Sequence, residues 1–495
     1  MKLYTLFEKS LDIKVLSRDN RRYEYLFFDV PTGLTILEVC YRVDGDARVD
    51  LGLFEETSSS SRPKISSFRG WSGSDRRCVV AGRELSTPGY VCRPINQGRW
   101  AIALGFPDEG KEVHVHVEVR ASSSEEVIAG LDAPILKGGI ANLPADLEAA
   151  RDAVQKIPGV PIYRELPGHR LGMLCGDFHT HSWHSGDAKT PVVEMVAAAE
   201  TRRMDFLAIT DHNTNAHWAE IDAVQPYTSV ALIKGQEVTT YYGHFNAFLP
   251  GRLVDFRIEN DKDLSDALEE MDHSSGLLSI NHPKAIGPQW KLSYHERFDA
   301  LEAWQAPWLW FNNESTRKWE ELLRCGRRIT AIGGSDVHDL RAMPVHQYGC
   351  PATWVYSPSD RSPSGILEAV RRGAVSVTAT PDSAIVVLER RVGNDSSEGW
   401  IPAMGWEISA EESLRARVLG GLGRLVLRVV GQNGRAKEWI CVDGDGEFLL
   451  ENPAEFGEWL RLEAWGKGVY IPGPFGLSES TLVSFSNPVF IAIDR

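Results

Sequence analysis

The chain of 495 residues is 43% hydrophobic and 24% charged, a composition typical of a folded globular protein with room for about two to four domains. Its formal net charge of −15 gives no general attraction to nucleic-acid phosphates or anionic lipids, so we expect neither nucleic acid nor a membrane as a partner. No stretch approaches the run of about 18 apolar residues that a membrane-spanning helix requires.

The N-terminal sequence and the cysteines indicate where the protein is located. The first residues, MKLYTLFEKSLDIKVL, lack the basic start, apolar stretch and cleavage site of a secretory signal. The seven cysteines are odd in number, scattered and without a CxxC pair, which is typical of reduced thiols and not of a disulfide framework or a zinc finger. Together these features predict a cytoplasmic protein.

Both ends of the chain have the pattern of all-β domains. Near the N-terminus, runs such as YEYLFFDV, ILEVCYRV and VHVHVEV alternate apolar and polar residues between Gly, Pro and Ser. This pattern predicts an N-terminal β-sandwich domain and a linker over residues 1–165. Runs such as RLVLRVVG, AKEWICVD and NPVFIAID predict a second β-sandwich domain over residues 385–495.

Between residues 166 and 384 the pattern changes to strands that alternate with amphipathic helices. LCGDFHTH, DFLAITDH and ALIKGQEVTT predict strands, whereas PVVEMVAAAETRR, NESTRKWEELLRCG and SGILEAVRRG predict helices. This alternation predicts an α/β fold with a parallel, barrel-like sheet. In barrels of this kind the active site is built at the C-terminal ends of the strands.

Metal-capable side chains recur at or just after the ends of these predicted strands. His179 and His181 end the first strand, and both imidazoles are presented together because residues two apart on a strand point to the same side. A lone histidine at a strand end is more often a structural residue than a ligand, but structural histidines have no reason to recur at several strand ends. The pattern predicts one metal centre, with no ligand from either β domain. The candidate ligands are His179, His181, Asp187, His212, Glu237, His244, His282, Asp336 and His338.

The order of these residues carries a family resemblance. Read as HxH, a loop acid, TDH, Glu, His, NHP and SDxH, it resembles the PHP metal-dependent hydrolases, named for polymerase and histidinol phosphatase. RGWSGSDRR and TPGY before this region, with a β domain after it, resemble the CehA/McbA branch, named for carbaryl hydrolysis. The resemblance implies an α/β fold in which a distorted (β/α)7 PHP barrel is flanked by N-terminal and C-terminal β-sandwich domains. It also implies two to three divalent metal ions at the mouth of the barrel.

The resemblance assigns the candidate ligands to three metals, with Glu237 bridging the first two. This branch often has an acid directly after the Ser of the loop, whereas Gly186 intervenes here before Asp187, and His184 is an alternative ligand at the third site. The implied sets are His179, His181, Glu237 and Asp336 for the first metal, Glu237, His244 and His282 for the second, and Asp187, His212 and His338 for the third.

The chemistry of these side chains indicates hydrolysis without reference to the family. Imidazole and carboxylate ligands suit zinc, manganese or iron, and the absence of cysteine argues against a closed structural zinc site. Two ions about 3.5–4 Å apart can hold a hydroxide between them and lower the pKa of the bound water toward about 7. They also neutralise charge that develops on a substrate oxygen. No GxSxG or GxxxxGK[ST] motif suggests a rival mechanism.

The residues near the predicted centre leave the substrate class open. Lys284 and Arg341 follow strand ends and could anchor a phosphate, although each is as readily a solvated surface charge. Trp308 and Trp310 could line a pocket for a planar leaving group, although packing of a helix explains them as simply. We predict a hydrolase of a small-molecule ester, first a phosphoesterase and second a carbamate or carboxylic ester hydrolase.

A third hypothesis is a non-enzymatic binding protein in which the metals only stabilise the barrel. The open ligand set without cysteine speaks against it, because structural sites are normally closed. The sequence does not indicate an oligomeric state. The candidate catalytic residues are Glu237, His184, Asp211, Lys284 and Arg341.

Overall fold

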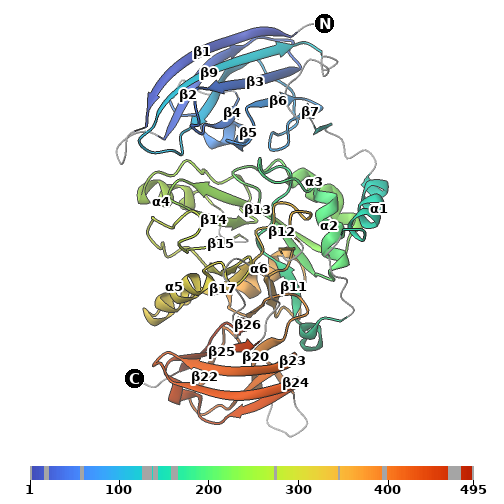
Figure 1. Cartoon of the computed structure of the whole chain (residues 1–495), viewed down its shortest axis with the longest axis vertical. Coiled ribbons are helices and arrows are strands. Elements are labelled where there is room, and N and C mark those ends of the chain that lie inside the picture. The colour runs from blue at the N-terminus through green and yellow to red at the C-terminus, as the bar shows by residue number, and fades with distance from the viewer. Residues whose placement is uncertain are drawn as a thin grey trace.

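The structure of the chain is a computed structural model in which three regions follow one another along the longest axis (Figure 1). N-terminal strands form the first region, a mixed α/β region lies in the middle, and C-terminal strands form the third. No helix among the residues described is long and apolar enough to span a membrane. The structure describes residues 3–15, 22–55, 61–124, 136–137, 143–157, 165–271, 276–343, 346–392, 399–466 and 481–492.

The N-terminal strands form two antiparallel four-stranded sheets that share an apolar core. Val113, Val115 and Val117 of one strand are buried in this core, whereas His114 and His116 face carboxylates on the outer side, as the alternation in VHVHVEV predicts. One sheet contains β1 (Tyr4–Lys14), β9 (Glu112–Ser122), β3 (Ile36–Val43) and β6 (Cys78–Gly82). The other contains β2 (Tyr23–Val30), β8 (Gly98–Gly105), β4 (Asp50–Phe54) and β5 (Phe68–Gly73). The short strands β7 (Leu85–Ser86) and β10 (Leu136–Lys137) pair with each other, and α1 (Leu143–Val154) follows.

Cys40 and Cys78 form a disulfide between β3 and β6, where the two residues are directly paired. The prediction that the cysteines are reduced thiols is therefore wrong for this pair. The two residues are 38 positions apart and belong to no cysteine motif, so only the folded sheet brings them together. Because structural disulfides are rare in reducing compartments, this pair removes the cysteine argument for a cytoplasmic location.

The central region combines parallel and antiparallel strand pairs with helices. β11, β12 and β13 pair in parallel, as do β15, β16 and β17, and β14 is antiparallel to both β13 and β15. The strands are β11 (Leu174–Asp177), β12 (Phe206–Ile209), β13 (Ala231–Thr240), β14 (Gly243–Phe248), β15 (Leu277–Ile280), β16 (Ala300–Gln305), β17 (Thr330–Gly334), β18 (Ala352–Val355) and β19 (Val375–Thr378). The helices are α2 (Val192–Thr201), α3 (Trp218–Val224), α4 (Asp261–Glu269), α5 (Asn312–Arg324) and α6 (Pro363–Arg371).

This connectivity brings the carboxyl ends of the parallel strands to one edge. A parallel bridge between Thr180 and Val337 joins the segment after β11 to the segment after β17, so the first and last of these strands also meet there. The region is a mixed α/β domain with a large sheet. A distorted (β/α)7 barrel stays a prediction, because the described strands outnumber the helices and four of the strand pairs in this region are antiparallel.

The C-terminal strands continue the central sheet. β26 pairs antiparallel with β19, and Phe485 of β26 is fully buried against Trp304 of β16 and Trp319 of α5. The predicted boundary at residue 384 is therefore crossed by backbone hydrogen bonds and by a common apolar core. The strands are β20 (Ile385–Arg391), β21 (Trp400–Pro402), β22 (Glu407–Ser409), β23 (Leu414–Gly431), β24 (Ala436–Leu450), β25 (Trp459–Gly466), β26 (Thr481–Ser486) and β27 (Val489–Ala492).

Replacing Phe485 tests whether the C-terminal strands stabilise the central region. Phe485→Ala removes a ring buried between two tryptophans, so we expect the free energy of unfolding to fall by about 3–5 kcal/mol in urea denaturation. Ile440 on β24 is 55% exposed, and Ile440→Thr is the matched control with an expected change of about 0.5 kcal/mol or less. Equal losses in the two variants would contradict the common core.

Candidate metal centre

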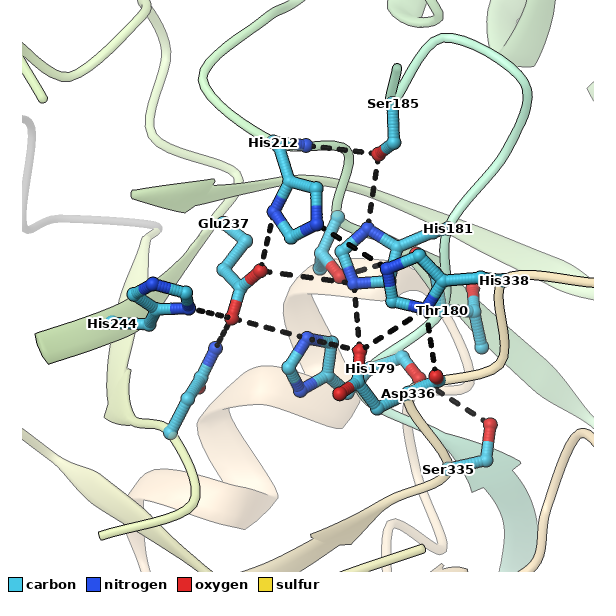
Figure 2. A network of polar contacts seen from close by, with 12 residues as sticks. His179, Thr180, His181, Ser185, His212, Glu237, His244, Ser335, Asp336 and His338 are labelled. Carbon is cyan, nitrogen blue, oxygen red and sulfur yellow. Dashed lines mark hydrogen bonds and ion pairs between the residues drawn. The ribbon is translucent and has the colours of Figure 1, made fainter. Parts of the chain in front are cut away.

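The structure brings the nine predicted ligands together at the carboxyl edge of the central strands, and all of them except Asp187 and His282 are labelled in Figure 2. His179 and His181 follow β11, and Asp187 lies in the next loop. The other positions are His212 after β12, Glu237 in β13, His244 in β14, His282 after β15, and Asp336 and His338 after β17. The HxH and DxH spacings direct two side chains from one segment toward the same point, as residues two apart in an extended chain do.

Glu237 lies at the middle of the cluster, with only 1% of its side chain exposed. Its Oε2 atom is 2.7 Å from His212 Nδ1, and its Oε1 atom is 3.2 Å from His244 Nδ1 and 3.3 Å from His179 Nε2. Burial alone would raise the pKa of Glu237, but His179, His244 and His212 hold it well below its usual range. The carboxylate is therefore ionised, and its two oxygens face different imidazoles, which is the position of a bridging ligand.

Asp336 is a second acid within the cluster, with 18% of its side chain exposed. Its Oδ1 atom lies 2.9 Å from His181 Nε2 and 3.3 Å from His179 Nε2. These atoms are at ion-pair distance, yet none of the three makes a well-oriented hydrogen bond, and the same is true of Glu237 Oε2. Buried polar atoms are almost always hydrogen-bonded, so this shared exception fits atoms that point to a common cation.

Three sets of residues each have their potential ligand atoms within 4.8 Å of one another. Together the three sets fit two or more divalent ions. Asp187 lies at the rim beside the set that contains His212 and His338, since its Oδ2 atom is 3.5 Å from His212 Nε2 and 3.4 Å from His338 Nε2. Its side chain is 41% exposed, so this position is more open than the Glu237 position. The sets are His179 with Glu237 and His282, His179 with His181 and Asp336, and His181 with His212 and His338.

The imidazoles of the cluster have opposite preferences for a proton in the absence of metal. Burial, followed by repulsion from His338 and His212, lowers the pKa of His181 to about 3. Burial acts in the same direction on His338, but its contacts with Asp187 and Asp336 raise its pKa to about 9. A metal ligand must be deprotonated, so His181 is ready to bind whereas His338 must release a proton.

Two of the candidate ligands have a backbone conformation that is unusual for non-glycine residues. His282 has a φ of 27° and Asp336 a φ of 57°, in the left-handed region that non-glycine residues rarely adopt. Such conformations persist only where the surrounding structure enforces them, and they cluster at functional sites. Asn213, next to the candidate ligand His212, shares this conformation, as do residues outside the site such as Leu249.

Several buried groups that support the ligands were not predicted from the sequence. Glu302 of β16 has one oxygen 3.0 Å from His179 Nδ1, and the other accepts a hydrogen bond from the backbone N–H of His282. Asp177 accepts backbone hydrogen bonds from His179 and from Ser335, which connects β11 to β17. The only signal in the sequence is an acidic residue within an apolar strand, as in ALEAWQ and LCGD.

Two of the predicted catalytic residues do not reach the cluster. Asp211 accepts hydrogen bonds from the backbone and hydroxyl groups of Ser182 and Ser185, so it positions the loop after His181. His184 Nδ1 accepts a hydrogen bond from the backbone of Gly89, and its Nε2 lies 2.9 Å from Glu220. The prediction that His184 replaces a ligand at the third site is wrong, because both its nitrogens face other groups.

The two predicted substrate cations also differ in position. Lys284 is 5% exposed and donates hydrogen bonds to Gln305 and Asn312, and burial lowers its pKa to about 8 although Glu302 and Asp336 favour its charge. Arg341 is 49% exposed and forms an ion pair with Glu194 of α2. Of these two cations, Lys284 is the one whose pKa responds to the acids Glu302 and Asp336 of the centre.

Removing Glu237 tests its central position. Glu237→Ala deletes a carboxylate that faces five of the imidazoles, so we expect it to lower bound metal by about two equivalents, whereas His212→Ala lowers it by about one. Elemental analysis of metal-reconstituted protein measures the difference, with the exposed Glu411→Ala as control. Equal losses from the two site variants would contradict the bridging assignment.

Replacing Glu302 tests the supporting residues. Glu302→Gln keeps the size of the side chain but removes the charge that orients His179, so we expect metal affinity to fall about ten- to a hundredfold. A competition titration with a metal chelator measures the affinity. Glu321→Gln, with a side chain 55% exposed on α5, should leave it unchanged, and an unchanged affinity in both variants would exclude the orienting role.

Comparison with known proteins supports part of the prediction. Residues 177–304 match the PHP domain family, and the match ends before Asp336 and His338. No curated protein matches the chain. A structure described as a candidate metal-dependent phosphoesterase from Bifidobacterium adolescentis is 16% identical with a TM-score of 0.25, and covers 35% of this chain and 90% of its own. A β-glucosidase from Kluyveromyces marxianus in complex with glucose is 8% identical with a TM-score of 0.12, and covers 95% of this chain and 46% of its own. Neither TM-score indicates a shared fold, and the similarity to the PHP domain family extends over residues 177–304.

Proposed function

We propose that the chain is a metal-dependent hydrolase that acts as a phosphoesterase. The observation that carries the proposal is the buried, ionised Glu237 carboxylate with imidazoles on both of its oxygens. The PHP match over residues 177–304 supports the same class of enzyme. Divalent ions bound at such a centre would supply an activated water and would stabilise negative charge on the ester oxygen.

The side chains of the protein have separate tasks in this proposal. Glu237 would hold the metals together with the imidazoles around it, and Glu302 fixes the ring of His179 so that Nε2 points into the centre. Asp211 holds the loop after His181 through its serine hydrogen bonds. The ammonium group of Lys284 adds a fixed positive charge beside Glu302 and Asp336, which favours binding of an anionic substrate.

The alternative of a carbamate or carboxylic ester hydrolase depends on an aromatic pocket. Trp308 instead packs on Trp304 and on Trp465 of β25, at the contact with the C-terminal strands. Trp310 is 37% exposed and lies beside His346. These positions favour the packing explanation for the tryptophans, so the phosphoester remains our first choice.

A purely structural role for the metals is the other alternative. The rim residues Asp187 and His338 have side chains 41% and 28% exposed, whereas the ligands of a structural site are normally closed off by protein. This partial exposure favours an enzyme.

The proposal further includes a small-molecule ester substrate, zinc, manganese or iron as the metal, a distorted barrel, the CehA/McbA-like branch and a cytoplasmic location.

The two predicted cations provide a test with an internal control. Lys284→Met keeps the length of a buried side chain but removes its charge, so we expect kcat/KM on 4-nitrophenyl phosphate to fall about ten- to a thousandfold at unchanged metal content. Arg341→Met should leave kcat/KM unchanged, because Arg341 pairs with Glu194 at the surface.

The same assay decides between the two ester classes. Metal-reconstituted protein is screened across phosphomonoesters, phosphodiesters and aryl carbamates, with inorganic phosphate as a competitive inhibitor. The phosphoesterase proposal fails if an aryl carbamate turns over faster than every phosphoester and phosphate does not inhibit. Absence of turnover with every substrate would support the structural role.

A further inference from the structure

A cavity of about 350 Å³ lies against the metal centre and is walled by two regions of the chain. The central region contributes Asp187, His212 and His244, which are candidate ligands. The N-terminal sheets contribute the opposite wall, which includes Asp50 and the loop between β5 and β6. A substrate bound to the metals would therefore also contact the N-terminal region.

The hairpin between β13 and β14 fixes one side of this wall. Tyr241 at its tip donates a hydrogen bond of 2.6 Å to Asp50, and its ring stacks on Tyr23 at 5.5 Å. A Cβ atom at Gly105 would lie 2.3 Å from the Tyr241 hydroxyl oxygen, so a larger residue there would displace this hydroxyl group. The same hairpin carries the candidate ligands Glu237 and His244 on its two strands.

The loop that carries Asp187 fixes the other side. A Cβ atom at Gly186 would lie 2.4 Å from the carbonyl oxygen of Ser72 and 3.0 Å from Asp75 Cβ. Gly186 therefore allows this loop to touch both β5 and the loop between β5 and β6. Arg76 in the same N-terminal loop donates a hydrogen bond of 2.8 Å to the carbonyl oxygen of Trp183. These contacts hold the N-terminal wall at both ends. Residues of the N-terminal sheets and of the central region also share a continuous apolar core.

The charged groups on this wall differ in what they already bind. Arg48 is held by hydrogen bonds to Asp108, and Asp50 accepts the hydrogen bond from Tyr241. Asp75 accepts no hydrogen bond among the residues described, yet its carboxylate interacts electrostatically with Asp187 and His212. It is exposed and lines the cavity, so it faces the centre across open space.

We propose that the N-terminal β region forms the far wall of the substrate cavity, and that Asp75 is a specificity residue that binds a cationic group on the alcohol part of a phosphomonoester. The proposal rests on the proposed phosphoesterase function. A carboxylate at this position attracts an ammonium group and repels a second phosphate. It therefore favours amino alcohol phosphates over diphosphates, and it orients the phosphoryl group toward the metals.

Two phosphates that differ only in the distal group test this proposal. The dissociation constants of 2-aminoethyl phosphate and ethyl phosphate for the metal-loaded full chain are measured by calorimetry, and kcat/KM is measured for both. We expect the full chain to prefer 2-aminoethyl phosphate by about five- to fiftyfold, the effect of one charged hydrogen bond. Asp75→Asn should abolish the preference without changing the affinity for ethyl phosphate.

Asp46→Asn is the matched control, because it removes the same charge from a side chain that is 95% exposed and pairs with Lys111. It should retain the preference. Equal affinities for the two phosphates in the unmodified chain, or an unchanged preference in Asp75→Asn, would overturn the proposal. Loss of bound metal from Asp75→Asn would also overturn it, by making Asp75 a metal ligand. A preference in binding without hydrolysis would refute the phosphoesterase function alone and would support the assigned wall.

Discussion

The burial of the Glu237 carboxylate is the constraint on which the rest of this structure depends. An ionised carboxylate withdrawn from water is costly unless positive or hydrogen-bonding groups surround it. Here the strands β12, β13, β14 and β15 end or pass at distances that allow His212, His244 and His282 to meet the same acid. The arrangement of the sheet therefore also determines the charge balance of the centre, because the strands place the histidines around the Glu237 carboxylate.

Further buried acids extend this arrangement outward. Asp177, Asp211 and Glu302 contact backbone N–H groups, hydroxyl groups or imidazole nitrogens, and none of them is exposed by more than 1%. Each holds a ligand-bearing segment in position without facing the centre itself. Such supporting contacts limit how far a ligand can move, so the geometry of the centre is built into the protein before any ion binds.

The sequence predicted those parts of the site that local spacing determines. His179 and His181 were found because two residues in an extended segment share a face, and Glu237 because it ends the apolar run LIKGQE. Glu302 was missed, since a single acid inside ALEAWQ has no periodic signal. Lys284 and Arg341 could not be separated, because proximity to a strand end does not show that Arg341 turns back to Glu194 on α2. The Cys40–Cys78 disulfide and the approach of Asp75 to the centre depend on contacts between distant segments, which no local pattern encodes.

The pairing of β19 with β26 has a consequence for the order in which parts of the protein can fold during synthesis. During synthesis β19, at residues 375–378, emerges well before β26, at residues 481–486. Until then one edge of the central sheet has free backbone groups, and Trp304 and Trp319 lack the ring that covers them. Unpaired edges and exposed aromatic surface are the features that nascent chains must protect from aggregation. We therefore expect the central region to complete its folding only after the strands beyond it have left the ribosome.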